Sequence, residues 1–183
     1  MLQVAMNLVE NITLIGLAGW LMIGVSLPAT CPQRTTAIEP LSYSMEIVQP
    51  ADLSSQKEAI LVATNQQRTR KRLPILKQDA KLMQAAQEYA ELMAAKDQMS
   101  HTLNGLTLPA KAKRVGYSFR VLSENIALNT RLDGRSVVVD QWMESKGHRE
   151  NILTKDIKDI GIGIAGPSKQ NRYYYCQLFG AQL

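Results

Sequence analysis

Ile160-Gly-Ile-Gly-Ile164 gives the clearest indication of the fold of this 183-residue chain. It is followed by Gly166-Pro-Ser-Lys-Gln-Asn171 and then by Tyr173-Tyr-Tyr-Cys-Gln-Leu-Phe179. The first part of this stretch alternates isoleucine with glycine, the middle part is rich in turn-forming residues, and the last part is aromatic and β-prone. Alternation with a period of two is typical of strands, and a turn-rich segment between two such runs is typical of a hairpin. We therefore predict an antiparallel hairpin near the C-terminus.

Two helices are predicted upstream of the hairpin. Ser55 and Glu58 have the spacing of a capping box, which predicts a first helix that ends before Pro74. Asp79 is placed to cap a second helix, whose core-facing stripe should face a sheet. The positions of this stripe are Leu82, Ala86, Tyr89, Met93 and Lys96. Helices followed by strands favour an α+β domain built in layers.

Two further segments are interpreted from local chemistry. The basic residues between Arg68 and Arg72 lie at the end of the first helix, where cations stabilise the helix dipole. The run from Ser136 to Met143 has valines that favour a strand, whereas Val138 and Trp142 have helical spacing. Local sequence therefore leaves this run open between strand and helix.

The first part of the chain has a different composition. Asn11 to Gln33 contains no charged residue, and its length fits a signal sequence or one membrane span. Prolines are concentrated in the segment that follows, which is typical of an extended linker. We predict a signal peptide or membrane anchor over residues 1–30, a linker over 31–52 and a single domain over 53–183.

The charge balance indicates which partners fit. All 21 Lys and Arg residues and 15 of the 16 acids lie from Arg34 onward, which gives this part a net charge of +6. Lipid headgroups or an anionic envelope polymer fit such a surface, although this excess is also common on proteins that bind nothing acidic. Nucleic acid is not indicated, because no module of interleaved aromatic and basic residues occurs. The two cysteines, Cys31 and Cys176, make no disulfide framework.

Three polar positions could carry chemistry. His101 and His148 are the only histidines, and imidazole titrates near neutral pH and binds metals. Glu124 lies among apolar residues, where a buried acid needs a partner such as histidine. Each also has a purely structural alternative, since histidines cap helix ends and glutamates accept backbone N–H groups. No G-x-S-x-G, P-loop, H-E-x-x-H or paired C-x-x-C motif is present.

Several short motifs follow one another in a fixed order: Asn65-Gln-Gln-Arg68, Leu73-Pro-Ile-Leu76, Ser100-His-Thr102, Arg114-Val-Gly-Tyr117, Glu124-Asn-Ile-Ala127 and Gly147-His-Arg-Glu-Asn-Ile-Leu153. In this order they resemble the bacterial branch of the CAP superfamily, the cysteine-rich secretory, antigen 5 and pathogenesis-related proteins, whose domain is also called SCP. The resemblance covers the chain from about Ser55 to Gly180. It implies a three-layer α-β-α sandwich, a helix for the valine run and an extracytoplasmic location, secreted or membrane-anchored.

The resemblance also implies a site. Members of the family typically gather two histidines and two acids in a central cleft, and His101, Glu124 and His148 match three of these positions. Animal members place the fourth acid three residues after the tryptophan, which is Ser145 here. Glu144 stands one position earlier and is the candidate for the fourth acid. Gly147 lies between it and His148 and is expected to interrupt any helix that joins them.

Three functions agree with this sequence. The first is a non-enzymatic module that binds a lipid or an envelope polymer in the cleft. The second is a hydrolase in which His101 and His148 hold a divalent metal such as zinc, with Glu124 as third ligand or general base. The third is a structural partner-binding module with a vestigial cleft, attached to the membrane if the N-terminal segment is uncleaved. We favour binding, because the resemblance implies no agreed reaction.

Overall fold

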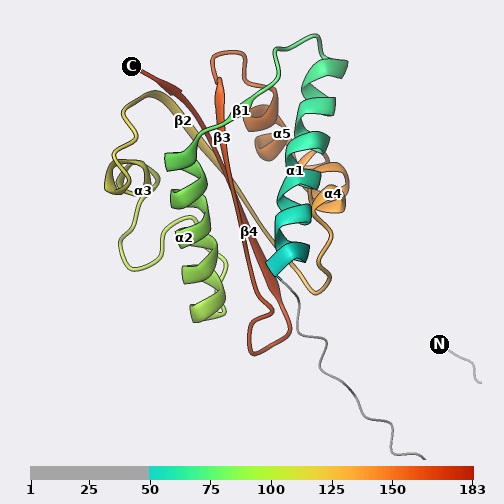
Figure 1. Cartoon of the computed structure of the whole chain (residues 1–183), viewed down its shortest axis with the longest axis vertical. Coiled ribbons are helices and arrows are strands. Elements are labelled where there is room, and N and C mark those ends of the chain that lie inside the picture. The colour runs from blue at the N-terminus through green and yellow to red at the C-terminus, as the bar shows by residue number, and fades with distance from the viewer. Residues whose placement is uncertain (1–49) are drawn as a thin grey trace, which may run out of the picture. The chain divides into compact units, whose positions relative to one another are not determined.

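The computed structural model describes residues 50–183 (Figure 1). The predicted leader or anchor and nearly all of the predicted linker lie outside these residues. Among the described residues, no helix has the length and apolar character that crossing a membrane requires. The elements follow in the order α1 (Pro50–Arg70), β1 (Lys77–Gln78), α2 (Ala80–Lys96), α3 (Leu108–Arg114), β2 (Phe119–Asn129), α4 (Gly134–Ser136), the π-helical turn η1 (Val137–Trp142), α5 (Lys146–Leu153), β3 (Asp159–Ala165) and β4 (Tyr173–Gln182).

The strands form one sheet in the order β1-β3-β4-β2. β3 and β4 pair antiparallel, which confirms the predicted hairpin, and β2 lies antiparallel on the other side of β4. β2 is therefore an edge strand, along which β4 supplies the only neighbour in the described sheet.

Helices cover both faces of this sheet. In Figure 1, α2 and α3 lie on one side of the strands, and α1, α4 and α5 lie on the other. The α-β-α sandwich implied by the family resemblance is thus confirmed, and so is the α+β class. Alternate residues of β4 separate into two cores: Tyr173, Tyr175 and Phe179 pack in one, and Tyr174, Cys176 and Leu178 in the other.

The glycines of β3 explain how α2 packs on the sheet. Ile160, Ile162 and Ile164 point into the core under α1, so Gly161 and Gly163 face α2. A Cβ atom built on Gly163 would lie 2.1 Å from the carbonyl oxygen of Ala86, a residue of α2. The Ile-Gly alternation is therefore a requirement for close contact between helix and strand backbones.

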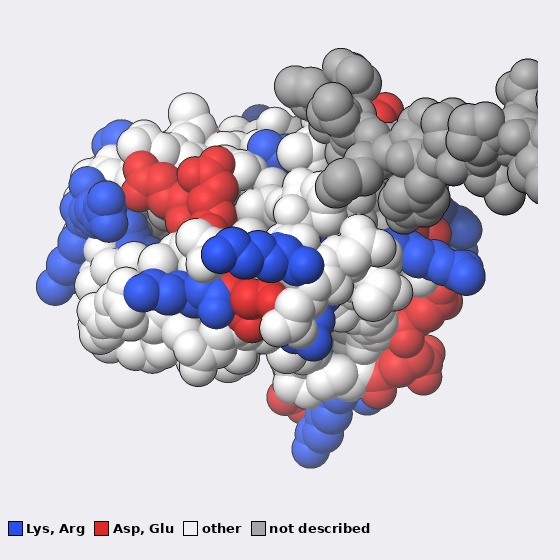
Figure 2. Space-filling model, turned by 90° about the horizontal axis from the view of Figure 1, so that it is seen from below, with Lys and Arg blue, Asp and Glu red and all other residues white. Residues whose placement is uncertain are grey.

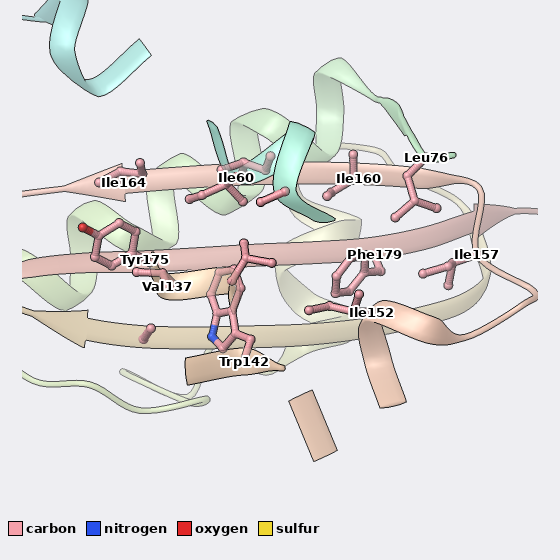
Figure 3. Close-up of a cluster of buried hydrophobic side chains, with 14 of the residues drawn as sticks. Ile60, Leu76, Val137, Trp142, Ile152, Ile157, Ile160, Ile164, Tyr175 and Phe179 are labelled. Atoms are coloured by element: carbon pink, nitrogen blue, oxygen red, sulfur yellow. The ribbon is translucent and has the colours of Figure 1, made fainter. Parts of the chain in front are cut away.

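The core under α1 is drawn in Figure 3, where Trp142 lies between the sheet and the helical layer. Its indole Nε1 donates to the main-chain oxygen of Ile126 at 3.1 Å. The amide of Met143 donates to the oxygen of Val138, five residues back, which is the π-helical pattern. The valine run is helical, as the family resemblance implies.

The helix ends show one correct and one wrong prediction. Asp79 caps α2 as predicted, because its side chain accepts from the amides of Lys81 and Leu82 at 2.9 and 3.0 Å. The capping box at Ser55 is wrong, since α1 already begins at Pro50 and the Ser55 hydroxyl donates to the oxygen of Asp52 inside the helix. The buried stripe of α2 ends at Met93, because Lys96 is exposed.

Arg68 has a larger role than its position suggested. It is fully buried, whereas Arg70 and Lys71 are exposed. Its guanidinium donates to the oxygen of Pro74 and to the oxygens of Ile152 and Thr154, each at 2.8 Å. Arg68 therefore joins the end of α1 to the end of α5, the helix that carries His148.

Candidate functional site

His101 lies in the connection between α2 and α3, and its ring is held from one side. Nδ1 of His101 lies 2.7 Å from Oε1 of Glu124, while 60% of the His101 side chain remains exposed. The preceding residue is also fixed, because the hydroxyl of Tyr89 donates to the oxygen of Ser100 at 2.7 Å. The ring thus has one nitrogen bound to the protein and an exposed face.

Glu124 is the centre of the arrangement. It lies in β2, with a side chain that is 3% exposed and points to the same side of the sheet as Ile126. One carboxylate oxygen meets His101, and the other forms an ion pair with Nζ of Lys111. This carboxylate is buried, and both of its oxygens already have partners.

Lys111 of α3 is almost completely buried, with 1% of its side chain exposed. Besides Glu124, its ammonium donates to the main-chain oxygen of His101 at 3.0 Å and lies 3.1 Å from the centre of the Tyr89 ring. Burial lowers the pKa of Lys111, and the adjacent charge of Glu124 opposes this change. Lysine at such a position is held as a cation by a carboxylate, a carbonyl and an aromatic face.

Two neighbouring groups stay neutral beside this ion pair. Burial and the charge of Glu124 raise the pKa of the Cys176 thiol well above its ordinary value. Burial, followed by the charge of Glu124, raises the pKa of the Tyr89 hydroxyl as well. Neither group can serve as an anionic nucleophile near neutral pH.

His148 approaches from the other layer, on α5. Burial lowers the pKa of its imidazole, and the charge of His101 lowers it further. The two rings are therefore close enough for charge on one to disfavour charge on the other. Both histidines contact neighbouring residues of the edge strand β2: His101 binds the side chain of Glu124, and the main-chain oxygen of His148 accepts from Asn125.

A chain of buried amides fixes the backbone of α5 near His148. Asn125 of β2 donates to the oxygen of His148 at 3.1 Å and accepts from Asn151 at 2.9 Å. Asn125 also donates to the side chain of Gln177, which donates to the hydroxyl of Thr64 at 2.8 Å. These contacts connect α1, β4, β2 and α5, so that α5 is held at a fixed distance from Glu124.

Comparison with known proteins gives the family. The model of the CAP family, described as the cysteine-rich secretory protein family, matches residues 61–179, which is more than half of the chain. This chain belongs to the CAP family.

Two proteins of Bacillus subtilis are among its relatives. The chain is 30% identical over 115 residues to YkwD of Bacillus subtilis, a match that covers 62% of this chain and 44% of YkwD. It is also 30% identical over 147 residues to the membrane protein YlbC of the same organism, covering 80% of this chain and 40% of YlbC. The chain therefore spans less than half the length of these two relatives.

Solved structures agree with the CAP fold. An extracellular protein of Bacillus anthracis that contains an SCP domain matches with a TM-score of 0.65 and 26% identity, covering 74% of this chain and 44% of that one. An outer surface protein of Borrelia burgdorferi matches with a TM-score of 0.64 and 25% identity, covering 70% of this chain and 94% of that one. Bacterial relatives of the CAP domain are thus extracellular or surface proteins.

The residues implied by the CAP resemblance are only partly brought together. His101 contacts Glu124, and His148 lies near His101. Glu144 is exposed and forms no hydrogen bond or ion pair with either histidine. The chain leaves η1 at Trp142 and starts α5 at Lys146, so Glu144 lies in the break between the two helices. The break therefore precedes Gly147, which lies inside α5 and does not itself interrupt the helix.

The residues present do not fit a three-ligand metal centre. Glu124, the expected third ligand, has one oxygen on His101 and the other on the ammonium of Lys111. Over residues 50–183, no group of three His, Cys, Asp or Glu side chains has the arrangement that holds a metal ion. That His101 and His148 hold an ion such as zinc stays a prediction.

Lys111 is the part of the site that sequence reasoning missed. In α3 it shares an apolar stripe with Leu108 and Val115, at spacings of three and four residues, and both of these pack against the core under α2. A lysine within the apolar stripe of a short amphipathic helix is the signal that could have found it. The basic neighbours Lys113 and Arg114 are exposed and obscure this pattern.

Proposed function

We propose that this chain is an extracytoplasmic CAP domain that binds an anionic envelope polymer, such as a phosphodiester polymer, through the imidazoles of His101 and His148. The observation that carries the proposal is the exposed ring of His101, whose Nδ1 is bound to a carboxylate that Lys111 already neutralises. The ring is therefore fixed in orientation while its outer nitrogen is free to meet a ligand.

The proposed extracytoplasmic location is supported by the descriptions of related proteins. The Bacillus anthracis neighbour is described as extracellular and the Borrelia neighbour as an outer surface protein, and YlbC is described as a membrane protein. An envelope location gives the domain access to polymers that carry negative charge. The apolar N-terminal stretch agrees with export or attachment to a membrane.

The charge of the site favours an anion over an apolar ligand. Glu124 and Lys111 neutralise one another, so each imidazole that takes up a proton adds an uncompensated positive charge. The chain as a whole is also positive, at +5. Figure 2 shows a face on which basic and acidic side chains are interspersed, so on that face the excess charge does not form one patch. Local charge at the histidines then determines where the polymer binds.

The first experiment compares ligands and variants. The full chain, purified in a neutral detergent, is titrated with poly(glycerol phosphate), with neutral dextran as control, and is also mixed with phosphatidylglycerol vesicles. We expect saturable binding of poly(glycerol phosphate) that is lost in His101→Gln/His148→Gln and kept in Lys96→Gln, which removes an exposed charge. Binding to vesicles alone would favour a lipid ligand, and binding to neither would favour the structural module; both results contradict the proposal.

Acidification should strengthen binding of the polymer. Burial lowers the pKa of His148 below its ordinary value of 6.5. The ring is therefore neutral at pH 7.5, and it gains its charge only as the pH falls through this lowered pKa. One added charge contributes about 1 kcal/mol at contact distance in water, or about fivefold in affinity. We expect the affinity for poly(glycerol phosphate) at pH 5 to exceed that at pH 7.5 by up to about fivefold at low salt, and the gain to shrink at high salt. Unchanged affinity over this range would contradict a role for the imidazoles.

A further inference from the structure

The ammonium of Lys111 occupies a cage made by the site itself. Its contacts are Oε2 of Glu124, the main-chain oxygen of His101 and the face of the Tyr89 ring. All of these groups stabilise a cation. With 1% of the Lys111 side chain exposed, the cage is closed to water and its charge is balanced by Glu124.

Stability alone gives no reason for this buried pair. Replacing a buried ion pair with apolar residues of similar volume is often neutral or stabilising, because burying two charges is costly. Removing only one partner is different, since the other charge is then left buried and unpaired. The ion pair is therefore better explained by the side chain that it holds in position than by its contribution to the stability of the fold.

The pair fixes His101 in two ways. Lys111 binds the main chain of His101 directly, and it binds the ring through Glu124. A carboxylate held by an ammonium accepts hydrogen bonds and cannot donate them. The proton between Glu124 and His101 must therefore lie on Nδ1 of His101. Nε2, the nitrogen on the exposed side of the ring, is then the atom that takes up a second proton and donates it to an anion.

We propose that Lys111 is the positioning residue of this site: as a built-in cation it keeps Glu124 as an acceptor and so holds a proton on Nδ1 of His101. The neutral form of His101 is then the Nδ1-protonated tautomer, and Nε2 is left to take up the proton that meets the anionic ligand. The proposal rests on the proposed function only in making Nε2 the ligand-facing atom. The tautomer itself is a property of the free protein.

The test reads the tautomer directly. Long-range ¹H–¹⁵N spectra of the imidazoles are recorded at pH 8 for the full chain, without ligand, in the wild type, in Lys111→Met and in Lys113→Met, which changes an exposed lysine of the same helix. We expect His101 of the wild type and of Lys113→Met to be neutral with its proton on Nδ1. In Lys111→Met most of the His101 signal should leave this form, because an unpaired Glu124 takes up a proton or shares one with the ring. A spectrum of His101 that is the same in Lys111→Met would overturn the proposal.

Chemical rescue keeps the proposal testable if Lys111→Met fails to fold. Lys111→Ala lacks the atoms of n-propylammonium, and this ion fits the vacated cage, whereas n-propanol has a similar shape without the charge. We expect n-propylammonium to raise the thermal midpoint of Lys111→Ala and to restore the wild-type signal of His101, and n-propanol to do neither. Equal effects of the two additives would show that Lys111 only fills space.

The two proposals fail in different ways. If Lys111 positions His101 and His101 binds the polymer, Lys111→Met should change the tautomer and lower the affinity for poly(glycerol phosphate) about tenfold. Metal sites lose a similar factor in affinity when the group that orients a histidine ligand is removed. A changed tautomer with unchanged affinity would overturn the proposed function and leave the role of Lys111 intact. An unchanged tautomer overturns the role of Lys111 whatever the affinity.

Discussion

Replacing Arg68 with alanine should lower the free energy of unfolding by about 3–5 kcal/mol, because three carbonyl groups lose a charged donor. A loss of this size is a large part of the roughly 5–15 kcal/mol that stabilises an ordinary domain. Urea unfolding of the full chain, followed by the fluorescence of the buried Trp142, measures it.

Two further variants test whether stability depends on the branched shape of the Arg68 guanidinium. Arg70→Ala changes an exposed arginine two residues later and should alter stability by less than about 0.5 kcal/mol. Arg68→Lys keeps the charge, but a single ammonium cannot serve Pro74 on one side and both Ile152 and Thr154 on the other. We expect it to lose most of what Arg68→Ala loses. Equal losses in Arg68→Ala and Arg70→Ala would mean that Arg68 does no more than complement the helix dipole.

Gly163→Ala should destabilise the domain by about 3 kcal/mol, because the added Cβ would lie 2.1 Å from the oxygen of Ala86 and 2.5 Å from the amide nitrogen of Gln87. Both atoms belong to the backbone of α2, so the helix must move away from the sheet. The same urea measurement detects the effect.

Gly147 provides the matched control. It lies in α5, and nothing within 4 Å would meet a Cβ atom there. Gly147→Ala should leave stability unchanged or raise it by up to about 1 kcal/mol, since alanine is the better helix former. If both substitutions had the same effect, the close packing of α2 on β3 would not be the reason for glycine in that strand.

These glycines show what a sequence can predict. The alternation in Ile160–Ile164 predicts a strand because a period of two places every second residue on one face. It cannot show that the glycine face meets a helix backbone, since that depends on where α2 lies. The cap at Asp79 is local and was predictable, whereas the start of α1 was not, because residues before Ser55 also extend the helix.

In the candidate site, too, the sequence predicts local features, while the contacts that depend on packing appear only in the structure. The sequence offers a histidine as one suitable partner of a buried Glu124, with backbone N–H groups as the alternative, and the CAP resemblance places Glu124 in one cleft with His101 and His148. The apolar stripe of α3 is a signal for the burial of Lys111, but the sequence does not name the partners of Lys111 or of Arg68, because both residues lie in basic segments. Only the packing of α5 against α1, and of α3 against β2, separates these two buried cations from their exposed neighbours.

Binding through the two histidines is tested most directly by following the imidazole nitrogens of His101 and His148 by NMR while poly(glycerol phosphate) is added to the full chain. We expect Nε2 of His101 and the ring of His148 to shift in a saturable manner, while Nδ1 of His101 keeps its proton on the side of Glu124. Saturable binding of the polymer with both imidazole spectra unchanged would place the ligand elsewhere and contradict a role for these histidines.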